Sequence, residues 1–573
     1  MMNSIGKDGD GVNGAVARKL HHPDLAWQDL VAVLALFALL LSINGGAVTQ
    51  GFVADDDPII LAYTITHNPW DYFFNPRSWQ TLTMANLTPW LVLDFSMDYA
   101  LFGLNAAGYY AHVLFCLALC AILIYFILRH YTARPWAFCA SALFVLAPST
   151  ASLAHELMSR HYASGLLFGL LSAFFYIRAM GGTKQKTRYI NAWLGALTYL
   201  MALSSKEVYA LIPLILLALP CESIPRKIKL LAPYVLSAAI YLVWRRWMLG
   251  EWLGGYGGVN NNPVLVGTAV FMALAALYCW RVRRLSLLLI APIALLLPLL
   301  PVYGALWIIP RYQFVPTILL AVVITLLFEQ KVKAYKTWRI PVASLLIIMG
   351  LALAVSSQHA VQNISQRAYK QQVMDQPFWV GDEGWLLWVP EESVYQHIKG
   401  IENIREFTQH THGTPQFIYD EIQLHHLAQH PQSIQRYDEV LHRYVDYEQQ
   451  LPKTLAAWCG SLRQAPLAVD VNYNESNHFL NWAITPAQAG TYRLISVGGS
   501  AITIPVTGRA RIHIENPQFY IRYNSPEGWV TYSDLLTIPA NGSLHWQRQM
   551  GGVAQSLDQC VVSAYPVVYN RGL

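Results

Sequence analysis

Charged side chains are scarce in this sequence. Asp, Glu, Lys and Arg together make up 13% of the 573 residues, against roughly a quarter in an ordinary soluble domain. Hydrophobic residues make up 54%. A composition so poor in charge argues against a disordered chain and against a soluble enzyme. It indicates a membrane protein with a polar part attached.

Three further signatures are missing. No block of Lys and Arg is long enough to indicate nucleic-acid binding, and the net charge is only +5. No Gly-rich phosphate loop points to a nucleotide substrate. No internal repeat is visible, so a tail of tetratricopeptide type is excluded. The sequence therefore predicts a chain that lies in a lipid bilayer.

Long apolar runs fill the first two thirds of the sequence. A membrane-spanning helix needs about 20 mostly apolar residues, and about eleven runs qualify, of which the two between 189 and 220 are short. They centre on residues 28–46, 104–128, 136–152, 161–179, 189–204, 207–220, 228–248, 263–280, 284–303, 312–328 and 340–356.

The loops between these runs alternate in charge. Residues 184–188 and 331–339 are rich in Lys and Arg, whereas residues 47–103 contain only Arg77. Basic loops face the cytoplasm, so the tail 1–27 lies inside and, after an odd number of crossings, the C-terminal third lies outside. We predict a multi-pass protein of the cell inner membrane with a periplasmic C-terminal domain. Four Asn-x-Ser/Thr triplets also allow an ER membrane, which we favour less.

The composition changes after the last apolar run. We predict a transmembrane domain at 28–356, an outer helical region at 357–465 and an outer β-rich domain at 466–573. Short apolar strands alternate with turn dipeptides in the last part, which is typical of a β-sandwich. The predicted fold is an α-helical polytopic membrane protein with an outer α+β region. Cys459 and Cys560 both fall in that region. Either they form a disulfide or both remain free thiols.

The most informative segment directly follows the first apolar run. Asp55, Asp56 and Asp57 stand side by side in the first outer loop, 47–103. Adjacent carboxylates raise one another's pKa. Such a cluster beside a membrane therefore usually takes up a proton from a substrate or binds a metal ion. A solvated turn is the competing interpretation. Tryptophan and phenylalanine residues in 59–100 predict short helices in the membrane interface that roof the carboxylates, although anchoring alone also explains them.

A second group of ionisable residues lies at the predicted outer ends of other helices. Charges at membrane depth are costly and usually serve a function or a buried ion pair. Arginine binds phosphate oxygens in bidentate fashion, so outer arginines that face outer carboxylates would suit a lipid phosphate beside a general base. Interhelical salt bridges and headgroup snorkelling are the alternatives. The residues concerned are His155, Glu156, Arg160, Lys206, Glu207, Arg245, Arg246 and Arg311.

Six short segments stand in a characteristic order along the predicted transmembrane domain. They are Phe52-Val53-x-Asp55-Asp56, Thr88-Pro89-Trp90, Leu101-Phe102-Gly103-Leu104-Asn105-x-x-Gly108-Tyr109, Ser159-Arg160, Leu203-Ser204-Ser205-Lys206-Glu207 and Arg311-Tyr312-x-Phe314-x-Pro316. In this order they resemble the GT-C superfamily of membrane glycosyltransferases. The chain looks most like its transmembrane, tetratricopeptide-containing O-mannosyltransferases and their bacterial relatives. The resemblance covers residues 28–330 and stops there.

The resemblance implies transfer of a sugar from a polyprenyl-phosphate carrier to a protein or glycan acceptor at the outer membrane face. By position, Asp55 matches the general base of such enzymes and Asp56 its neighbour. Arginines and a lysine would hold the donor phosphate, and the candidates are Arg160, Lys206, Arg245, Arg246 and Arg311. The other residues expected at the cavity are His155, Glu156, Glu207 and Tyr312.

The second outer loop departs from the family pattern. The family often carries His-Pro-x-x-x-Glu before the arginine, whereas this chain reads Ala147-Pro148-Ser149-Thr150-Ala151-Ser152. The acidic position is thus Ser152, and Glu156 lies one helical turn further on. The role of a second carboxylate stays open. The C-terminal tail also differs from the family's repeats, so the resemblance does not imply which acceptor this chain uses.

Base-assisted displacement suits this residue set, because an acceptor hydroxyl is a poor nucleophile until a carboxylate takes its proton. Direct displacement would invert the anomeric centre. We expect no cofactor, although Asp55, Asp56 and Asp57 form a possible site for a divalent metal. The competing functions are a multi-pass transporter or lipid-sugar flippase, and an oligosaccharide ligase or polymerase. The charges lie at the outer helix ends, which favours a reaction at the membrane surface over transport of a substrate across the membrane.

Overall fold

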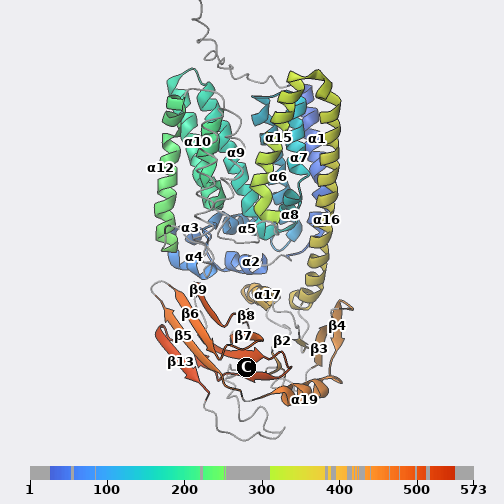
Figure 1. Ribbon diagram of the computed structural model, residues 1–573, viewed down its shortest axis with the longest axis vertical. Coiled ribbons are helices and arrows are strands. Elements are labelled where there is room, and N and C mark those ends of the chain that lie inside the picture. Colours follow the sequence, from blue (N-terminus) through green and yellow to red (C-terminus); the bar gives the residue numbers. More distant parts are fainter. Residues whose placement is uncertain are drawn as a thin grey trace, which may run out of the picture.

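Helices form one end of the molecule and strands the other (Figure 1). The computed structural model describes residues 26–548 with gaps. The residues outside the description are 1–25, 53–56, 84–85, 220–223, 251, 253–309, 381–384, 389–394, 409–415, 419, 423, 425–432, 439, 464, 476–477, 497–499, 512–516 and 549–573.

Six helices in the described part are long and apolar enough to cross a bilayer. A seventh span results if α7 (Arg134–Val145) and α8 (Pro148–His155), which meet at a bend of 53°, are taken together. The bend arises at Ala147, which is extended because the ring of Pro148 disfavours a helical residue before it. The six are α1 (Trp27–Asn44), α6 (Ala106–Arg129), α9 (Arg160–Gly181), α12 (Ile224–Leu249), α15 (Phe314–Ala334) and α16 (Arg339–Val380).

The predicted count of about eleven spans is not confirmed. Two candidates, at 263–280 and 284–303, lie outside the described residues. The candidate at 189–204 is α10 (Gln185–Ser205), which reaches about 31 Å at 1.5 Å per residue but is less apolar than the six. The candidate at 207–220 is a 3-10 turn, η3 (Glu207–Leu211), and the seven-residue α11 (Ile212–Ala218). That segment is too short to cross.

Four short helices form a layer across one end of the bundle (Figure 1). They are α2 (Asp57–Thr66), α3 (Asp71–Phe74), α4 (Pro76–Leu82) and α5 (Pro89–Phe102). Both α4 and α5 begin with proline, whose missing N–H costs no helical hydrogen bond in the first turn. Asn75 caps α4 by accepting a hydrogen bond from the amide of Arg77 at 3.1 Å. The first outer loop is therefore helical, as the sequence predicts.

The aromatic residues of this layer divide into two groups. Trp79 is buried and packs in one cluster with Met248 and Leu249 at the end of α12. Trp70 and Phe74 are exposed, as expected for groups that reach the membrane interface. The layer is thus fixed to the bundle by α12 rather than held by lipid contacts alone.

The two ends of the bundle differ in charge. α6 begins beside α5 and runs for 24 residues, or about 36 Å, before it reaches Arg129. α12 begins at the basic residues 226–229 and ends against α4. The basic helix ends therefore lie away from the layer formed by α2 to α5, in the way that the loop pattern predicts.

α16 continues far beyond the last apolar run. Its 42 residues correspond to about 63 Å, roughly twice the thickness of the hydrocarbon core. The predicted domain boundary at 356 falls inside this helix. The membrane part and the outer part therefore share one continuous helix, and the polar composition after 356 does not mark an element end.

The region predicted as helical, 357–465, also contains a small mixed sheet of order β2-β1-β3-β4. β1 (Trp385–Trp388) pairs in parallel with β2 (Gln416–Ile418) and β3 (Ser433–Asp438). β4 (Arg443–Asp446) is antiparallel to β3. Two helices accompany the sheet, α17 (Tyr395–Phe407) and α19 (Leu451–Ser461).

Two antiparallel sheets follow and share one apolar core. Their strand orders are β11-β10-β7-β8, with β12 paired to β10, and β13-β5-β6-β9. Alternate residues point inward, so Val469 and Val471 of one sheet pack with Ile521 and Tyr523 of the other. The strands are β5 (Ala468–Asn474), β6 (Phe479–Thr485), β7 (Thr491–Ser496), β8 (Ser500–Ile504), β9 (Thr507–Arg511), β10 (Gln518–Asn524), β11 (Val530–Tyr532), β12 (Leu536–Thr537) and β13 (Asn541–Gln547).

This strand-rich region has the sandwich arrangement that the sequence predicts. Cys560 lies outside the described residues, so its pairing with Cys459 stays a prediction.

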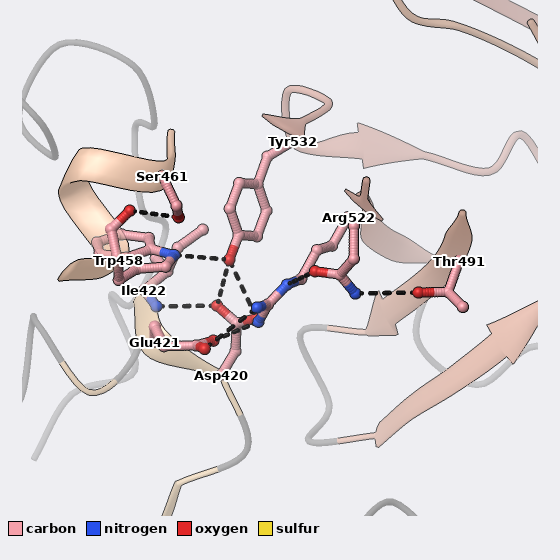
Figure 2. A network of polar contacts seen from close by, with 9 residues as sticks. Asp420, Glu421, Ile422, Trp458, Ser461, Thr491, Arg522 and Tyr532 are labelled. Carbon is pink, nitrogen blue, oxygen red and sulfur yellow. Dashed lines mark hydrogen bonds and ion pairs between the residues drawn. The ribbon is translucent and has the colours of Figure 1, made fainter. Parts of the chain in front are cut away.

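A buried ion-pair network holds the turn at Asp420 against the sandwich (Figure 2). Arg522 on β10 donates from Nη1 to Asp420 Oδ2 at 2.9 Å and also pairs with Glu421. The Tyr532 hydroxyl lies 3.5 Å from both Asp420 oxygens and accepts a hydrogen bond from Trp458 Nε1 at 3.2 Å. Burial raises the pKa of Asp420 to about 6, and Glu421 adds to the rise, whereas Arg522 lowers it.

Candidate functional site

The structure describes the residues on either side of Asp55 and Asp56. Asp55 and Asp56 are outside the described residues. Before them, Phe52 is buried and its ring meets that of Tyr109 edge-on at 5.0 Å. After them, Asp57 begins α2 with 0% of its surface exposed. Asp57 is therefore not part of a solvated turn, and the chain is buried both at Phe52 and at Asp57.

Tyr110 on α6 connects this segment to a second acidic residue. Its hydroxyl donates a hydrogen bond to the carbonyl oxygen of Gly51 at 3.1 Å. Both Asp57 and Glu156 act electrostatically on this hydroxyl. Glu156 follows α8, at the place where the sequence leaves the second carboxylate open. The start of α2 and the end of α8 thus bring two carboxylates into one neighbourhood.

Glu156 faces two arginines from different elements. Arg311 on η5 (Pro310–Gln313) places Nη1 4.0 Å from Glu156 Oε2. Arg367 on α16 places Nη2 3.6 Å from Glu156 Oε1. Ser159 donates to the same carboxylate at 3.4 Å. Arg367 was not predicted from the sequence, because it lies beyond the predicted end of the last span.

Lys206 is a further cation near Arg311. Its residue is extended (φ −164°, ψ 138°) between α10 and η3, and its Nζ lies 5.4 Å from the centre of the Tyr162 ring. Lys206 interacts electrostatically with both Arg311 and Glu207, and Lys206 and Arg311 both act on His161. Like charges held close in a partly buried site repel one another. Such a pair is well suited to an anionic ligand.

His155 belongs to the wall of this region. It is buried, and its Nδ1 lies 3.0 Å from Nε2 of Gln50, at the end of η1 (Gly45–Thr49). Gln50 also donates to Ser365 Oγ on α16 at 3.2 Å. This chain of polar contacts connects the start of the first outer loop to α8 and α16.

Arg160 is engaged in a different network, inside the protein. Its Nη2 lies 2.6 Å from Asp98 Oδ2 and 2.7 Å from His112 Nδ1, and its Nε lies 3.9 Å from Asp94. Ser164 donates to Asp94 at 2.7 Å. These are the contacts of an interhelical salt bridge between α5, α6 and α9. Arg160 is therefore paired with carboxylates inside the protein.

Asp94 and Asp98 were also not predicted from the sequence. The signal was present, because their i, i+4 spacing puts both carboxylates on one face of α5. Both are buried, and an unpaired carboxylate is costly there. A buried acidic pair of this kind requires a cation, and the structure supplies Arg160.

The pair Arg245 and Arg246 separates at the end of α12. Arg245 is buried and its Nε lies 3.5 Å from Glu207, which also accepts a hydrogen bond from the amide of Leu87 at 3.3 Å. Arg246 is exposed, as expected for a headgroup contact. Through Glu207, Arg245 is connected to Leu87 of the first outer loop, whereas Arg311 pairs with Glu156. Tyr312 lies on η5 beside Arg311, and its side chain is outside the description.

Among the described residues, no group of three or more His, Cys, Asp and Glu side chains is arranged to hold a metal ion. Asp55 and Asp56 are not among those residues, so a divalent metal at the acidic triplet stays a prediction.

No family model matches the chain, and no curated protein matches it. Among solved structures, it is similar to ArnT from Cupriavidus metallidurans in the apo state, with 11% identity over 74% of this chain and 94% of that chain and a TM-score of 0.42. The same protein bound to undecaprenyl phosphate matches with 12% identity, equal coverage and a TM-score of 0.37.

A second similarity is to the archaeal oligosaccharyltransferase AglB from Archaeoglobus fulgidus, in complex with an inhibitory peptide and a dolichol-phosphate. The identity is 9% over 83% of this chain and 74% of that chain, with a TM-score of 0.38. Likenesses of this size carry no argument for the chemistry of individual residues.

Proposed function

We propose that the chain is a membrane glycosyltransferase that moves a sugar from a polyprenyl-phosphate donor to a hydroxyl of a protein or glycan acceptor. The observation that carries the proposal is the meeting of carboxylates and cations at one end of the bundle. The acidic triplet ends at the buried Asp57, which shares its neighbourhood with Glu156. Arg311 pairs with Glu156, and Lys206 is near Arg311.

Asp55, Arg311 and Lys206 have roles in this reaction. Asp55 takes the proton of the acceptor hydroxyl while the acceptor oxygen attacks the anomeric carbon. The bond between that carbon and the phosphate oxygen breaks, and its electron pair leaves with the polyprenyl phosphate. Arg311 and Lys206 stabilise the negative charge that develops on the phosphate. The attack comes from the side opposite the leaving group, so the product is inverted.

The proposal includes an orientation. The elements that adjoin the two carboxylates, α2 and α8, lie toward the end of the bundle that faces the strand-rich region (Figure 1). The basic helix ends lie at the other end and, by the distribution of Lys and Arg, in the cytoplasm. We infer a bacterial inner membrane with the reaction and the outer region on the periplasmic side.

A transfer assay tests this function. Purified protein in nanodiscs is incubated with a radiolabelled polyprenyl-phosphate sugar and an envelope extract as the acceptor source. We expect label to move from the lipid to an acceptor. In sealed vesicles, movement of labelled lipid between leaflets without transfer would instead identify a flippase. Neither transfer nor movement, with donors of several sugars, would refute the proposal.

Arg311→Gln should lower kcat/KM for the lipid-linked sugar by about 10²-fold. Removing one fixed hydrogen-bond donor that stabilises charge in the transition state typically costs 10²–10³-fold in rate. The matched control is Arg77→Gln, which removes an equal charge from the exposed surface of α4 in the same layer and should leave kcat/KM unchanged. Initial rates at varied donor concentration measure the effect. Equal rates for Arg311→Gln and wild type would exclude Arg311 from the donor site.

A further inference from the structure

α17 packs on both parts of the molecule. It lies between the helix bundle and the sandwich, next to α2 (Figure 1). Ile404 on α17 belongs to the apolar core that contains Ile60 of α2 and the membrane helices. Ile398 and Ile401 belong to a second core, with Phe378 near the end of α16 and residues of the sandwich. The outer region therefore reaches the first outer loop through this helix.

At Gly400 the backbones of α17 and α2 are in direct contact. A Cβ atom added to Gly400 would lie 2.7 Å from both the amide nitrogen of Ile59 and the carbonyl carbon of Pro58. Ordinary non-bonded contacts lie at about 3.5–4.0 Å. Both neighbours are backbone atoms, so no side-chain rotation relieves the clash. Glycine inside a helix costs about 1 kcal/mol relative to alanine, and the close approach explains why it is present here.

The last turn of α17 is fixed to α16. Arg405 is buried, and its Nη1 donates a hydrogen bond to the carbonyl oxygen of Phe378 at 2.7 Å. α16 also carries Arg367, which faces Glu156. The two helices therefore approach the acidic neighbourhood together, α16 at Glu156 and α17 at the first turn of α2.

We propose that α17 is a positioning element for the start of α2, and that Gly400 sets the location of its first turn, which begins at Asp57. This inference rests on the proposed function. In the sequence Asp55 and Asp56 directly precede Asp57, so a displacement of the first turn of α2 moves the residue to which the proposed base is joined. Misplacement of a reacting group by about 1 Å can cost about 10²-fold in rate. The outer region is thus a positioning part of the active site, in addition to any contact with the acceptor.

Gly400→Ala tests this inference, with Gly460→Ala as the matched control. Both glycines are helical, but a Cβ atom at Gly460 in α19 would meet nothing within 4 Å. We expect Gly400→Ala to lower kcat by 10- to 100-fold with KM for the polyprenyl-phosphate sugar unchanged, because Arg311 lies on a separate element. We expect Gly460→Ala to keep wild-type kinetics. The assay uses full-length protein in nanodiscs.

Hydrogen exchange on the same proteins gives a readout that does not depend on activity. Amides of α2 should lose protection in Gly400→Ala, while those of α6 keep it. Wild-type kcat in Gly400→Ala, or unchanged protection of α2, would overturn the inference. A loss of activity accompanied by lowered protection throughout the bundle would also overturn it, since the effect would then be a general one. Absence of transfer by the wild-type protein would refute the proposed function, and the exchange pattern would still decide whether Gly400 fixes α2.

Discussion

Replacing Asp55 by asparagine should abolish sugar transfer and leave the protein folded and inserted in the membrane. The amide has nearly the shape of the carboxylate, but it cannot take the proton of the acceptor hydroxyl. A general base contributes typically 10²–10⁴-fold to a rate, so we expect a loss of about 10³-fold or more. The measurement is the initial rate of transfer from a radiolabelled polyprenyl-phosphate sugar by purified protein.

Asp71→Asn is the control for this substitution. Asp71 lies in the first turn of α3, in the same layer of short helices, and the change of charge and shape is identical. We expect its rate to equal that of wild type. Full activity of purified Asp55→Asn would remove the base assignment. An equal loss in both variants would show that the layer responds to charge in general.

Arg522→Met should open the outer region by breaking the network in Figure 2. Arg522 is buried on β10 and contacts the carboxylates of Asp420 and Glu421. Removal of one partner from a buried ion pair leaves an uncompensated charge and typically costs about 3–5 kcal/mol. At about 1.4 kcal/mol per factor of ten, the population of the opened form should rise by about 10²- to 10⁴-fold.

Limited proteolysis of the full-length protein measures this opening, because cleavage of a transiently opened region follows the population of the open form. Arg443→Met, on the exposed end of β4, removes the same charge and should leave the cleavage rate near that of wild type. A cleavage rate in Arg522→Met equal to that in Arg443→Met would show that the network does not hold the turn at Asp420 in place.

The membrane helices were predictable where the sequence is continuously apolar. α1, α6 and α15 coincide with long apolar runs, because burial in lipid requires the same property along the whole helix. The structure of the segment after Lys206 was not predictable, because a run of about a dozen apolar residues fits a short buried helix as well as a membrane span. The end of α16 at Val380 was also missed, since polar residues continue a helix outside the membrane without any change in backbone geometry.

The site was predictable in its residue types but not in its pairings. Arg160 and Arg311 looked alike in sequence, as arginines at outer helix ends. In the structure Arg160 lies 2.6 Å from Asp98, whereas Arg311 lies 4.0 Å from Glu156 and near Lys206. Such pairings join residues far apart in the chain, and a single sequence contains no record of them. The contact of Gly400 with Pro58 is of the same kind.

A cryo-EM map of the full-length protein with a polyprenyl-phosphate sugar bound tests the central claim most directly. We predict that the donor phosphate lies within hydrogen-bonding distance of Arg311 or Lys206. The carboxylate of Asp55 should face the anomeric carbon from the opposite side, with room for an acceptor hydroxyl between them. A map in which Asp55 and Asp56 point to bulk water, far from Arg311 and from the donor, would contradict the account.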